Sequence, residues 1–301
     1  MSILVDEKSR VLVQGMTGRE GMVRTRLMKD YGTKVVAGVT PGRGGDEVYG
    51  IPVYDTVQEA WEKIGPIDIS VIFVPAALVK NAALEAIDAG VKLLVIVPDR
   101  VPIYDVLEIS HLAKEKKANF VGPNTLGLVS PGKAVLGMIG GRAERAREWF
   151  RSGNIGVSSR SGGMTSAISY YITEAGLGQS TIVHVGGDAV VGLSHPEVME
   201  LFEQDEQTEI VAMFGEIGTT QEERVADLIE NRDFTKPLIA FIGGKAAKSG
   251  TRFSHAGAIV EGIRGSYDSK VKRLKEVGVH VVDSVSDIPR VALKLKKGGA
   301  R

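Results

Sequence analysis

Short runs of valine, isoleucine and leucine, separated by helix-like runs, constrain the fold of this chain more than any other feature. In the first half these runs occupy residues 10–15, 34–39, 68–75, 91–98 and 118–123, between helical patterns at 19–32, 56–65, 78–89 and 103–116. The apolar runs are continuous instead of alternating with polar residues. Strands of that kind are buried on both faces, which is typical of a parallel sheet covered by helices on either side.

A second series of the same kind follows, with strands expected at 154–159, 180–187, 208–216, 236–244 and 279–283. The stretch 127–153 is less regular and contains Pro131 and several glycines, so we interpret it as the connection. A chain of 301 residues fits two domains of about 150 residues each. We therefore expect two doubly wound α/β units in tandem, over residues 1–126 and 154–301.

Composition excludes several classes of function. With 37 basic and 37 acidic residues the formal net charge is zero, so no long-range field favours nucleic acid or a membrane surface as partner. The absence of cysteine excludes disulfides, thiol catalysis and thiolate metal sites. We see no signal peptide and no apolar run near the roughly 20 residues that span a bilayer, and we expect a cytoplasmic protein.

The first glycine-rich loop, VQGMTGREG, places Gly15, Gly18 and Gly21 between a predicted strand and a predicted helix. The spacing has one residue more than the dinucleotide fingerprint G-x-G-x-x-G. Glycine lets the backbone approach a phosphate, and the helix N-terminus supplies N–H donors and the positive end of its dipole. The loop therefore predicts a phosphate site, and the alternative is a tight turn without a ligand.

The loop after the second predicted strand, GVTPGRGG at 38–45, narrows the choice of ligand. Nicotinamide dinucleotide enzymes usually carry a carboxylate there for the ribose hydroxyls, whereas this loop offers Thr40 and Arg43. A cation suits a ribose that bears a phosphate, as in NADP or coenzyme A, although Arg43 alone could be a solvated loop residue. Pro75 and the segments 97–100 and 122–125 follow further strands and would complete the mouth of the site.

Three loops of the second half have functional character. SSRSGGMTSA at 158–167 would present the N–H groups of Ser161, Gly162 and Gly163 at a helix start, which is an anion site by geometry. GEIGTT puts a lone carboxylate, Glu216, at the end of an apolar strand. The stretch 243–258 brings Lys245, Lys248 and Arg252 close to His255 in sequence.

The chain has five histidines, and no two of them have metal-ligand spacing, so we expect no metal site. We interpret His111 as a helix surface residue, His184 as a core residue of a strand, and His195 as a capping or turn residue. His280 lies in a late strand. Only His255 lies in a glycine- and alanine-rich loop preceded by cations, which makes it the candidate catalytic histidine; the alternative is a histidine in an ordinary turn.

Taken together, QGMTGREG, AGVTPGRGG, SRSGG, GGD, GEIG and HAGAIV resemble, in order and spacing, the α subunit of succinate–CoA ligases over nearly the whole chain. The resemblance implies a Rossmann-like CoA-binding domain followed by a flavodoxin-like ligase domain. It also implies a β subunit with an ATP-grasp site for ATP or GTP and Mg²⁺, in an αβ or α2β2 assembly. This chain has no G-x-x-x-x-G-K-[ST] loop, which is consistent with a nucleotide held elsewhere.

The resemblance also assigns roles to residues. His255 would be phosphorylated by the nucleotide and would pass the phosphoryl group to a carboxylic acid, and CoA would attack the resulting acyl phosphate. Glu216 would hydrogen-bond the imidazole, and the N–H groups of 161–163 would stabilise the phosphohistidine. The expected CoA-binding residues are Gly15, Thr17, Gly18, Arg19, Glu20, Gly21, Arg43, Val97, Pro98 and Asp99.

Departures from the family pattern leave the identity of the acid substrate open. Arg43 stands where lysine is usual, Asp99 where glutamate is usual, and GPNTLG replaces GPNCPG. Ser166 replaces a tyrosine near the acid substrate, so we group Ser166, Asn124 and Thr125 as candidate substrate residues. SRSGGM and the threonine of GPNT are closer to the homologous region of ATP-citrate lyase. Succinate is the first expectation, and citrate, malate or a short carboxylate are alternatives.

Two other classes of function compete with this one. A CoA-binding or regulatory module without catalysis would not need His255, Glu216 and SRSGG together. An NADP-dependent oxidoreductase would need a hydride-transfer constellation in the second half, which we do not find, and a closer match to G-x-G-x-x-G.

Overall fold

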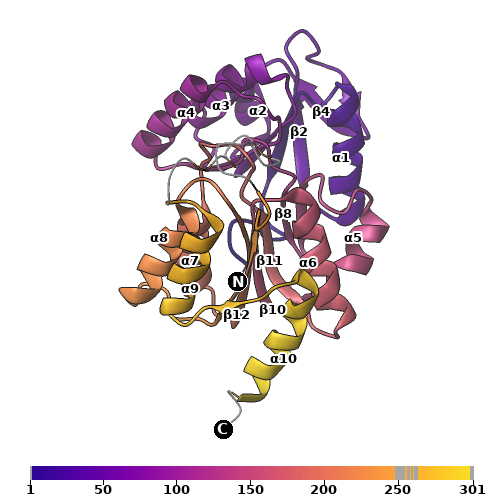
Figure 1. Cartoon of the computed structure of the whole chain (residues 1–301). Coiled ribbons are helices and arrows are strands. Elements are labelled where there is room, and N and C mark those ends of the chain that lie inside the picture. The colour runs from indigo at the N-terminus through magenta and orange to yellow at the C-terminus, as the bar shows by residue number, and fades with distance from the viewer. Residues whose placement is uncertain (1, 248–254, 256–257, 259, 261–263, 299–301) are drawn as a thin grey trace.

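The computed structural model describes residues 2–247, 255, 258, 260 and 264–298, and these residues form two sheets with helices on both faces (Figure 1). The first sheet has the order β3-β4-β2-β1-β5-β6-β7, and every neighbouring pair is parallel except β3 and β4. If β3 is left out and the other six strands are numbered in sequence order, their order across the sheet is 3-2-1-4-5-6, which is that of the dinucleotide-binding fold. Its strands are β1 (Val11–Gln14), β2 (Val35–Val39), β3 (Glu47–Val48), β4 (Ile51–Tyr54), β5 (Ile69–Ile72), β6 (Leu93–Ile96) and β7 (Asn119–Val121).

Both faces of this sheet are buried, as the continuous apolar runs predicted. In β1, Leu12 packs into one hydrophobic core while Val11 and Val13 pack into another. The Leu12 core is covered by helices α2 (Val57–Ile64), α3 (Val79–Asp88) and α4 (Ile103–Lys116), and α1 (Arg19–Tyr31) lies on the opposite face (Figure 1). A short 3-10 helix, η1 (Ala76–Leu78), precedes α3.

The second sheet has the order β14-β13-β12-β10-β11-β8-β9. Strands β10 to β14 are parallel and follow the order 2-1-3-4-5, which is that of flavodoxin-like folds. The expected fold class, a Rossmann-like domain followed by a flavodoxin-like one, is confirmed. The strands are β8 (Gly127–Ser130), β9 (Ala134–Gly137), β10 (Ser152–Ser159), β11 (Gln179–His184), β12 (Ile210–Glu216), β13 (Leu238–Gly243) and β14 (His280–Val281).

The segment 127–153, expected to be irregular, forms a strand pair and a helix. Strands β8 and β9 make an antiparallel hairpin on the edge of the second sheet, because β8 pairs antiparallel with β11. Helix α5 (Ala143–Trp149) follows the hairpin. Glycines at 127, 132 and 137 interrupt the apolar residues of this stretch, so its apolar runs are too short to predict strands.

Helices cover both faces of the second sheet (Figure 1). One face carries α7 (His195–Gln204), α8 (Gln221–Glu230) and α9 (Tyr267–Glu276), and the other carries α5, α6 (Gly162–Glu174) and α10 (Ile288–Gly298). A short 3-10 helix, η2 (Val285–Asp287), precedes α10. Within the described ranges, no helix combines the length and apolar character needed to span a bilayer.

The carboxyl ends of β7 and β11 meet and join the two halves. Gly122 N–H donates to Val185 O at 3.2 Å, and Leu193 N–H donates to Phe120 O at 2.7 Å. One hydrophobic core runs through the junction, since Val13 of the first sheet and Val183 of the second belong to the same cluster. The loops at the strand ends of both halves are therefore held at fixed positions relative to one another.

Candidate active site

The predicted catalytic pair lies within hydrogen-bonding distance. Nδ1 of His255 is 2.8 Å from Oε2 and 3.0 Å from Oε1 of Glu216. Glu216 ends β12 and its side chain is 3% exposed, whereas that of His255 is 23% exposed. Because the carboxylate can only accept, Nδ1 carries the proton and the lone pair of the neutral imidazole lies on Nε2. The pair thus presents Nε2 as the nucleophilic nitrogen.

A third residue, Arg160, completes the constellation, although no sequence motif marked it as a site residue. Its Nε donates to Oε1 of Glu216 at 3.0 Å, and its Nη2 donates to Gly187 O at 3.3 Å and Asp188 O at 3.1 Å. The side chain is fully buried. Its Nη1 is buried without an acceptor among the described residues. The only sequence signal was an arginine inside SRSGG, between a buried strand and a glycine-rich helix start.

The GGD segment after β11 forms the seat of the imidazole. A Cβ on Gly187 would lie 2.8 Å from Cδ2 of His255 and 3.1 Å from Nδ2 of Asn124. Gly186 has φ of 112° and packs against Pro123 O, where a Cβ would come within 2.4 Å. Both glycines are therefore required by close packing, and Gly187 lets the histidine ring lie directly against the backbone.

The start of α6 offers backbone donors at two of the three expected positions, because the N–H of Ser161 already donates to Ser159 Oγ at 3.2 Å. Ser161 is the N-cap, and its Oγ accepts from Met164 N–H at 3.5 Å. The N–H groups of Gly162 and Gly163 have no acceptor among the described residues. Gly163 is exposed, and Gly162 packs against Leu126. Arg160 directly precedes this turn, so the donors adjoin the Arg160–Glu216–His255 chain along the backbone.

Two buried histidines, His184 and His195, form hydrogen bonds with the segments that carry Arg160 and Glu216. Nδ1 of His184 accepts from Leu126 N–H at 2.7 Å, so its Nε2 donates to Arg160 O at 3.0 Å. His195 bonds Ser158 Oγ at 2.7 Å and Phe214 O at 3.1 Å. Burial lowers the pKa of each to about 4. The core interpretation of His184 agrees with this environment.

The interpretation of His195 as a capping or turn residue was wrong. Ser194 is the N-cap of α7, and His195 is the first residue of that helix, fully buried between β10 and β12. Its ring therefore belongs to the core below Arg160 and Glu216.

A pocket of about 560 Å³ opens in front of His255 and is lined by both halves of the chain. The first half contributes Asp99, Asn124 and the start of α4, and the second contributes Asp188 to Val190. Nδ2 of Asn124 donates to Oδ1 of Asp188 at 3.0 Å. Burial raises the pKa of Asp188, outweighing the hydrogen bond from Asn124. Two of the expected site residues, Asn124 and Asp99, thus lie in one pocket with His255.

Thr125 and Ser166, the unusual residues of the family pattern, lie in different surroundings. The Thr125 hydroxyl is buried, donates to His184 O and accepts from Gly127 N–H at 2.9 Å. Its hydrogen-bonding groups hold the 124–127 turn in place. Ser166 lies half-buried on α6, one turn beyond Gly162.

The first glycine loop is shaped by close backbone packing. Gly15 has φ of 78°, and its O accepts from Gly18 N–H at 3.1 Å. A Cβ on Gly21 would lie 2.1 Å from Gly15 O, so no side chain fits there. The amide N–H groups of Arg19, Glu20 and Gly21 have no acceptor among the described residues. A phosphate would find donors at this helix start.

The neighbouring strand ends bring the other expected CoA residues to the same edge. Thr17 N–H donates to Thr40 Oγ1 at 3.4 Å, which joins the loops after β1 and β2. Arg43 is 59% exposed and pairs at 2.5 Å with Asp46, the carboxylate that directly follows the 38–45 loop. Pro98 O accepts from Asn124 N–H at 2.8 Å, so the 97–99 segment leads from this edge into the His255 pocket.

Coenzyme A fits these residues on two counts. The first turn of α1 has unpaired amide donors for a phosphate, beside the exposed side chains of Arg19 and Arg43. The segment 97–99, at the same edge of the sheet, then leads into the pocket that His255 lines. Lys248 and Arg252, expected near His255, lie outside the described residues, and Lys245 lies 5.8 Å from the Tyr267 ring centroid.

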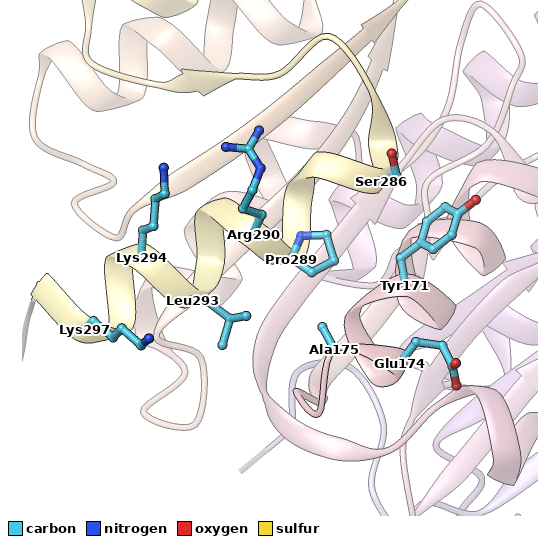
Figure 2. Close-up of a pocket in the computed structure, with 9 residues that line it drawn as sticks. All are labelled: Tyr171, Glu174, Ala175, Ser286, Pro289, Arg290, Leu293, Lys294 and Lys297. Carbon is cyan, nitrogen blue, oxygen red and sulfur yellow. The ribbon is translucent and has the colours of Figure 1, made fainter.

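Another hollow lies between α6 and α10 and contains none of the expected site residues (Figure 2). Its lining comes from the C-terminal end of α6, including Tyr171 and Glu174, and from one face of α10, including Arg290 and Leu293. The helix end at 161–163 lies at the opposite end of α6. In the described ranges we find no cluster of three histidine or acidic side chains placed to hold a metal ion.

Family models match the chain in two blocks, one in each half. A CoA binding domain matches residues 6–99, and a CoA-ligase domain matches residues 158–282. Fold, site and models together define a protein of the CoA-ligase class.

Relatives are similar over nearly their whole length. The ADP-forming succinate–CoA ligase subunit alpha 1 of Archaeoglobus fulgidus is 46% identical over 96% of each chain. An ADP-forming sulfoacetate-CoA ligase subunit of Acholeplasma is 43% identical over 94% of each chain. The chain belongs to the succinate–CoA ligase α-subunit family.

A solved structure extends the likeness in fold. ATP citrate lyase from Methanothrix soehngenii, in complex with citrate and coenzyme A, superposes with a TM-score of 0.90 at 21% identity. The match covers 99% of this chain and 52% of the lyase chain, so this chain spans about half the length of that enzyme.

Proposed function

We propose that this chain is the α subunit of an ADP-forming ligase that joins a small carboxylic acid to coenzyme A through a phosphorylated His255. The observation that carries the proposal is the hydrogen bond from Nδ1 of His255 to the buried Glu216. That bond presents Nε2 as the nucleophile, which is the arrangement a phosphoryl-accepting imidazole needs.

The reaction balances in three steps. Nε2 of His255 attacks the terminal phosphorus of ATP, and the bond to the bridging oxygen breaks to release ADP. A carboxylate oxygen of the acid then attacks the phosphohistidine, giving an acyl phosphate and restoring the imidazole. The CoA thiolate attacks the acyl carbon and expels phosphate. The sum is acid, CoA and ATP to acyl-CoA, ADP and phosphate.

The residues divide the work between the two halves. We assign CoA binding to residues 1–126, with phosphates at Gly15 to Gly21 and Arg43 and the thiol arm along 97–99. We assign phosphoryl transfer to 154–301, where the Gly162 and Gly163 N–H groups would stabilise the phosphohistidine. The 127–153 segment connects the two assignments in sequence. The nucleotide, with Mg²⁺, would be held by a β subunit with an ATP-grasp domain.

Succinate is the leading acid because relatives that are 43–46% identical include several succinate–CoA ligase α subunits. Sulfoacetate is the second candidate, since subunits of two sulfoacetate-CoA ligases are 42–43% identical over at least 94% of this chain. Both acids carry two anionic groups a short distance apart. Asn124, which lines the pocket with His255, would then help to shape the acid site.

The test is co-expression with the β subunit and an assay of succinate, sulfoacetate, malate, citrate and short monocarboxylates with ATP and CoA. We expect acyl-CoA formation with one dianionic acid, none with the isolated chain, and none with His255→Asn. His111→Asn, on the exposed face of α4, is the matched control and should be as active as the unaltered protein. Turnover by His255→Asn, or by the chain without its partner, would contradict the proposal.

A further inference from the structure

The site has a further feature: among the described residues, Glu216 is bonded both by a permanent cation, Arg160, and by the imidazole of His255. Arg160 Nε lies 3.0 Å from Oε1, and His255 Nδ1 lies 2.8 Å from Oε2. The carboxylate is 3% exposed. Removing the only partner of a buried carboxylate strongly destabilises a protein, because an uncompensated charge stays buried. The number of partners therefore matters in any reaction step in which one partner moves away from the carboxylate.

The two partners of Glu216 differ in whether their positive charge is permanent. Arginine stays protonated at every physiological pH, and the Arg160 side chain is fully buried. Histidine is cationic only when protonated, and the His255 side chain is partly exposed. Arg160 is also fixed by the carbonyl oxygens of Gly187 and Asp188, the segment against which the imidazole packs.

We propose that Arg160 is a positioning residue: it is the permanent counter-ion of Glu216, and it thereby lets His255 leave the carboxylate as a neutral nucleophile. The inference rests on the proposed function, because it concerns the step in which His255 reaches the nucleotide. Without Arg160, departure of the imidazole would strand a buried negative charge. With Arg160 in place, Glu216 orients the ring but does not hold it as an imidazolium.

Charge around His255 gives this role a measurable consequence. The charged and titratable groups on the surrounding elements are Glu216 on β12, Arg160 after β10, Asp188 after β11, Asp99 and Arg100 after β6, and the neutral His184 on β11. Arg160 is the fully buried cation of this set. Asp99 keeps its pairing with Arg100 at 3.3 Å, but removing Arg160 takes from Glu216 its permanent cation among the described residues, which favours the protonated imidazole.

The experiment measures the rate of His255 phosphorylation against pH in the complex with the β subunit. Arg160→Met should shift the midpoint of the acid limb upward by about one pH unit, with the rate recovering at alkaline pH. Arg160→Lys keeps the charge and should leave the midpoint near that of the unaltered protein. Arg224→Met, which removes an exposed arginine paired with Glu197 at 2.8 Å, should change neither midpoint nor rate.

A double variant keeps the test open if Arg160→Met does not fold. Arg160→Met with Glu216→Gln removes both charges and should unfold at a higher temperature than Arg160→Met alone, because no bare carboxylate remains buried. Its midpoint should lie above that of Glu216→Gln. The inference would be overturned if the midpoint of Arg160→Met were not above that of the unaltered protein, or that of the double variant not above that of Glu216→Gln. A double variant no more stable than Arg160→Met alone would also overturn it. Loss of labelling in the unaltered protein would instead refute the proposed function.

Discussion

The backbone of Gly187 lies against the imidazole of His255, so closely that a Cβ there would stand 2.8 Å from Cδ2. This contact fixes where the ring lies relative to Glu216 before any chemistry. It also makes one glycine of the GGD motif part of the histidine site.

Gly187→Ala should therefore displace the ring and slow phosphorylation of His255 by roughly 10- to 100-fold, because about 1 Å of misplacement is that costly. Coenzyme A affinity should stay unchanged, since the expected CoA residues lie in the first half. The measurement is the single-turnover rate of labelling with ATP in the complex. A rate equal to that of the unaltered protein would show that the ring does not need this seat.

A pair of glycine variants tests the first loop. A Cβ on Gly21 would lie 2.1 Å from Gly15 O, whereas one on Gly18 would lie 3.3 Å from the same atom. Gly21→Ala should destabilise the fold by about 1–3 kcal/mol and weaken CoA binding, because the loop must open to admit the methyl group. Gly18→Ala should have a smaller effect on both. Urea unfolding and calorimetric titration with CoA measure the two quantities, and equal effects of the two variants would contradict this account of the loop.

Stability should fall steeply on mild acidification because of His184 and His195. Burial lowers the pKa of each to about 4, while an unfolded histidine titrates near 6.5. Between these values the unfolded chain binds protons that the folded chain does not, so stability is full above about pH 6.5 and is lost as the pH falls towards 4. Each histidine accounts for about 3 kcal/mol over that window.

Urea titrations from pH 7.5 to 5 measure this slope. His195→Gln removes one of the two buried groups, so its slope between pH 6.5 and 5 should be clearly shallower, whatever its stability at neutral pH. His111→Asn is the exposed control and should keep the full slope. A His195→Gln slope equal to that of the unaltered chain would exclude His195 as a source of the acid sensitivity.

Lys270 anchors the loop behind Glu216. It is fully buried and pairs with Glu222 and with Glu223 at 2.9 Å, while Glu222 Oε1 accepts the N–H of Glu216 at 2.9 Å. Burial acts to raise the pKa of Glu222, but the charge and hydrogen bond of Lys270, together with smaller contributions from other neighbouring positive groups, outweigh it, so the net direction is downward. Lys270→Met should cost about 3–5 kcal/mol, because two carboxylates lose their cation.

The matched control for that prediction is Lys272→Met on the same helix. Lys272 is 79% exposed and lies 3.9 Å from Glu276, so its removal should change the free energy of unfolding by less than about 1 kcal/mol. Chemical unfolding at neutral pH compares the two. Similar small losses in both would mean that the buried cluster does not stabilise the fold.

Much of this architecture could be predicted from the sequence because continuous apolar runs have few other folds open to them. The runs at 10–15 and 208–216 became β1 and β12, and the parallel order then brings their carboxyl ends to ligand-binding edges. The two hairpins were missed for a physical reason. Strands β3 and β9 are short edge strands that pair with their hairpin neighbours β4 and β8, and the place of each hairpin is set by the pairing of β4 with β2 and of β8 with β11.

The site divides in the same way. Glu216 and His255 were expected as a pair from the family resemblance, and their hydrogen bond is present. Arg160 was missed because its partner lies 56 residues further along the chain, and no local pattern marks an arginine as buried. Burial and long-range charge pairing follow from the assembled fold, so they become visible only in three dimensions.

Locating the label tests most directly whether Nε2 of His255 carries the phosphoryl group. The complex is incubated with ATP, kept alkaline to preserve phosphohistidine, and analysed by peptide mass spectrometry and by phosphorus NMR, which distinguishes the two ring nitrogens. We expect a single phosphoryl group on His255, at Nε2, because Glu216 holds Nδ1. A label on another residue, or at Nδ1, would contradict the account.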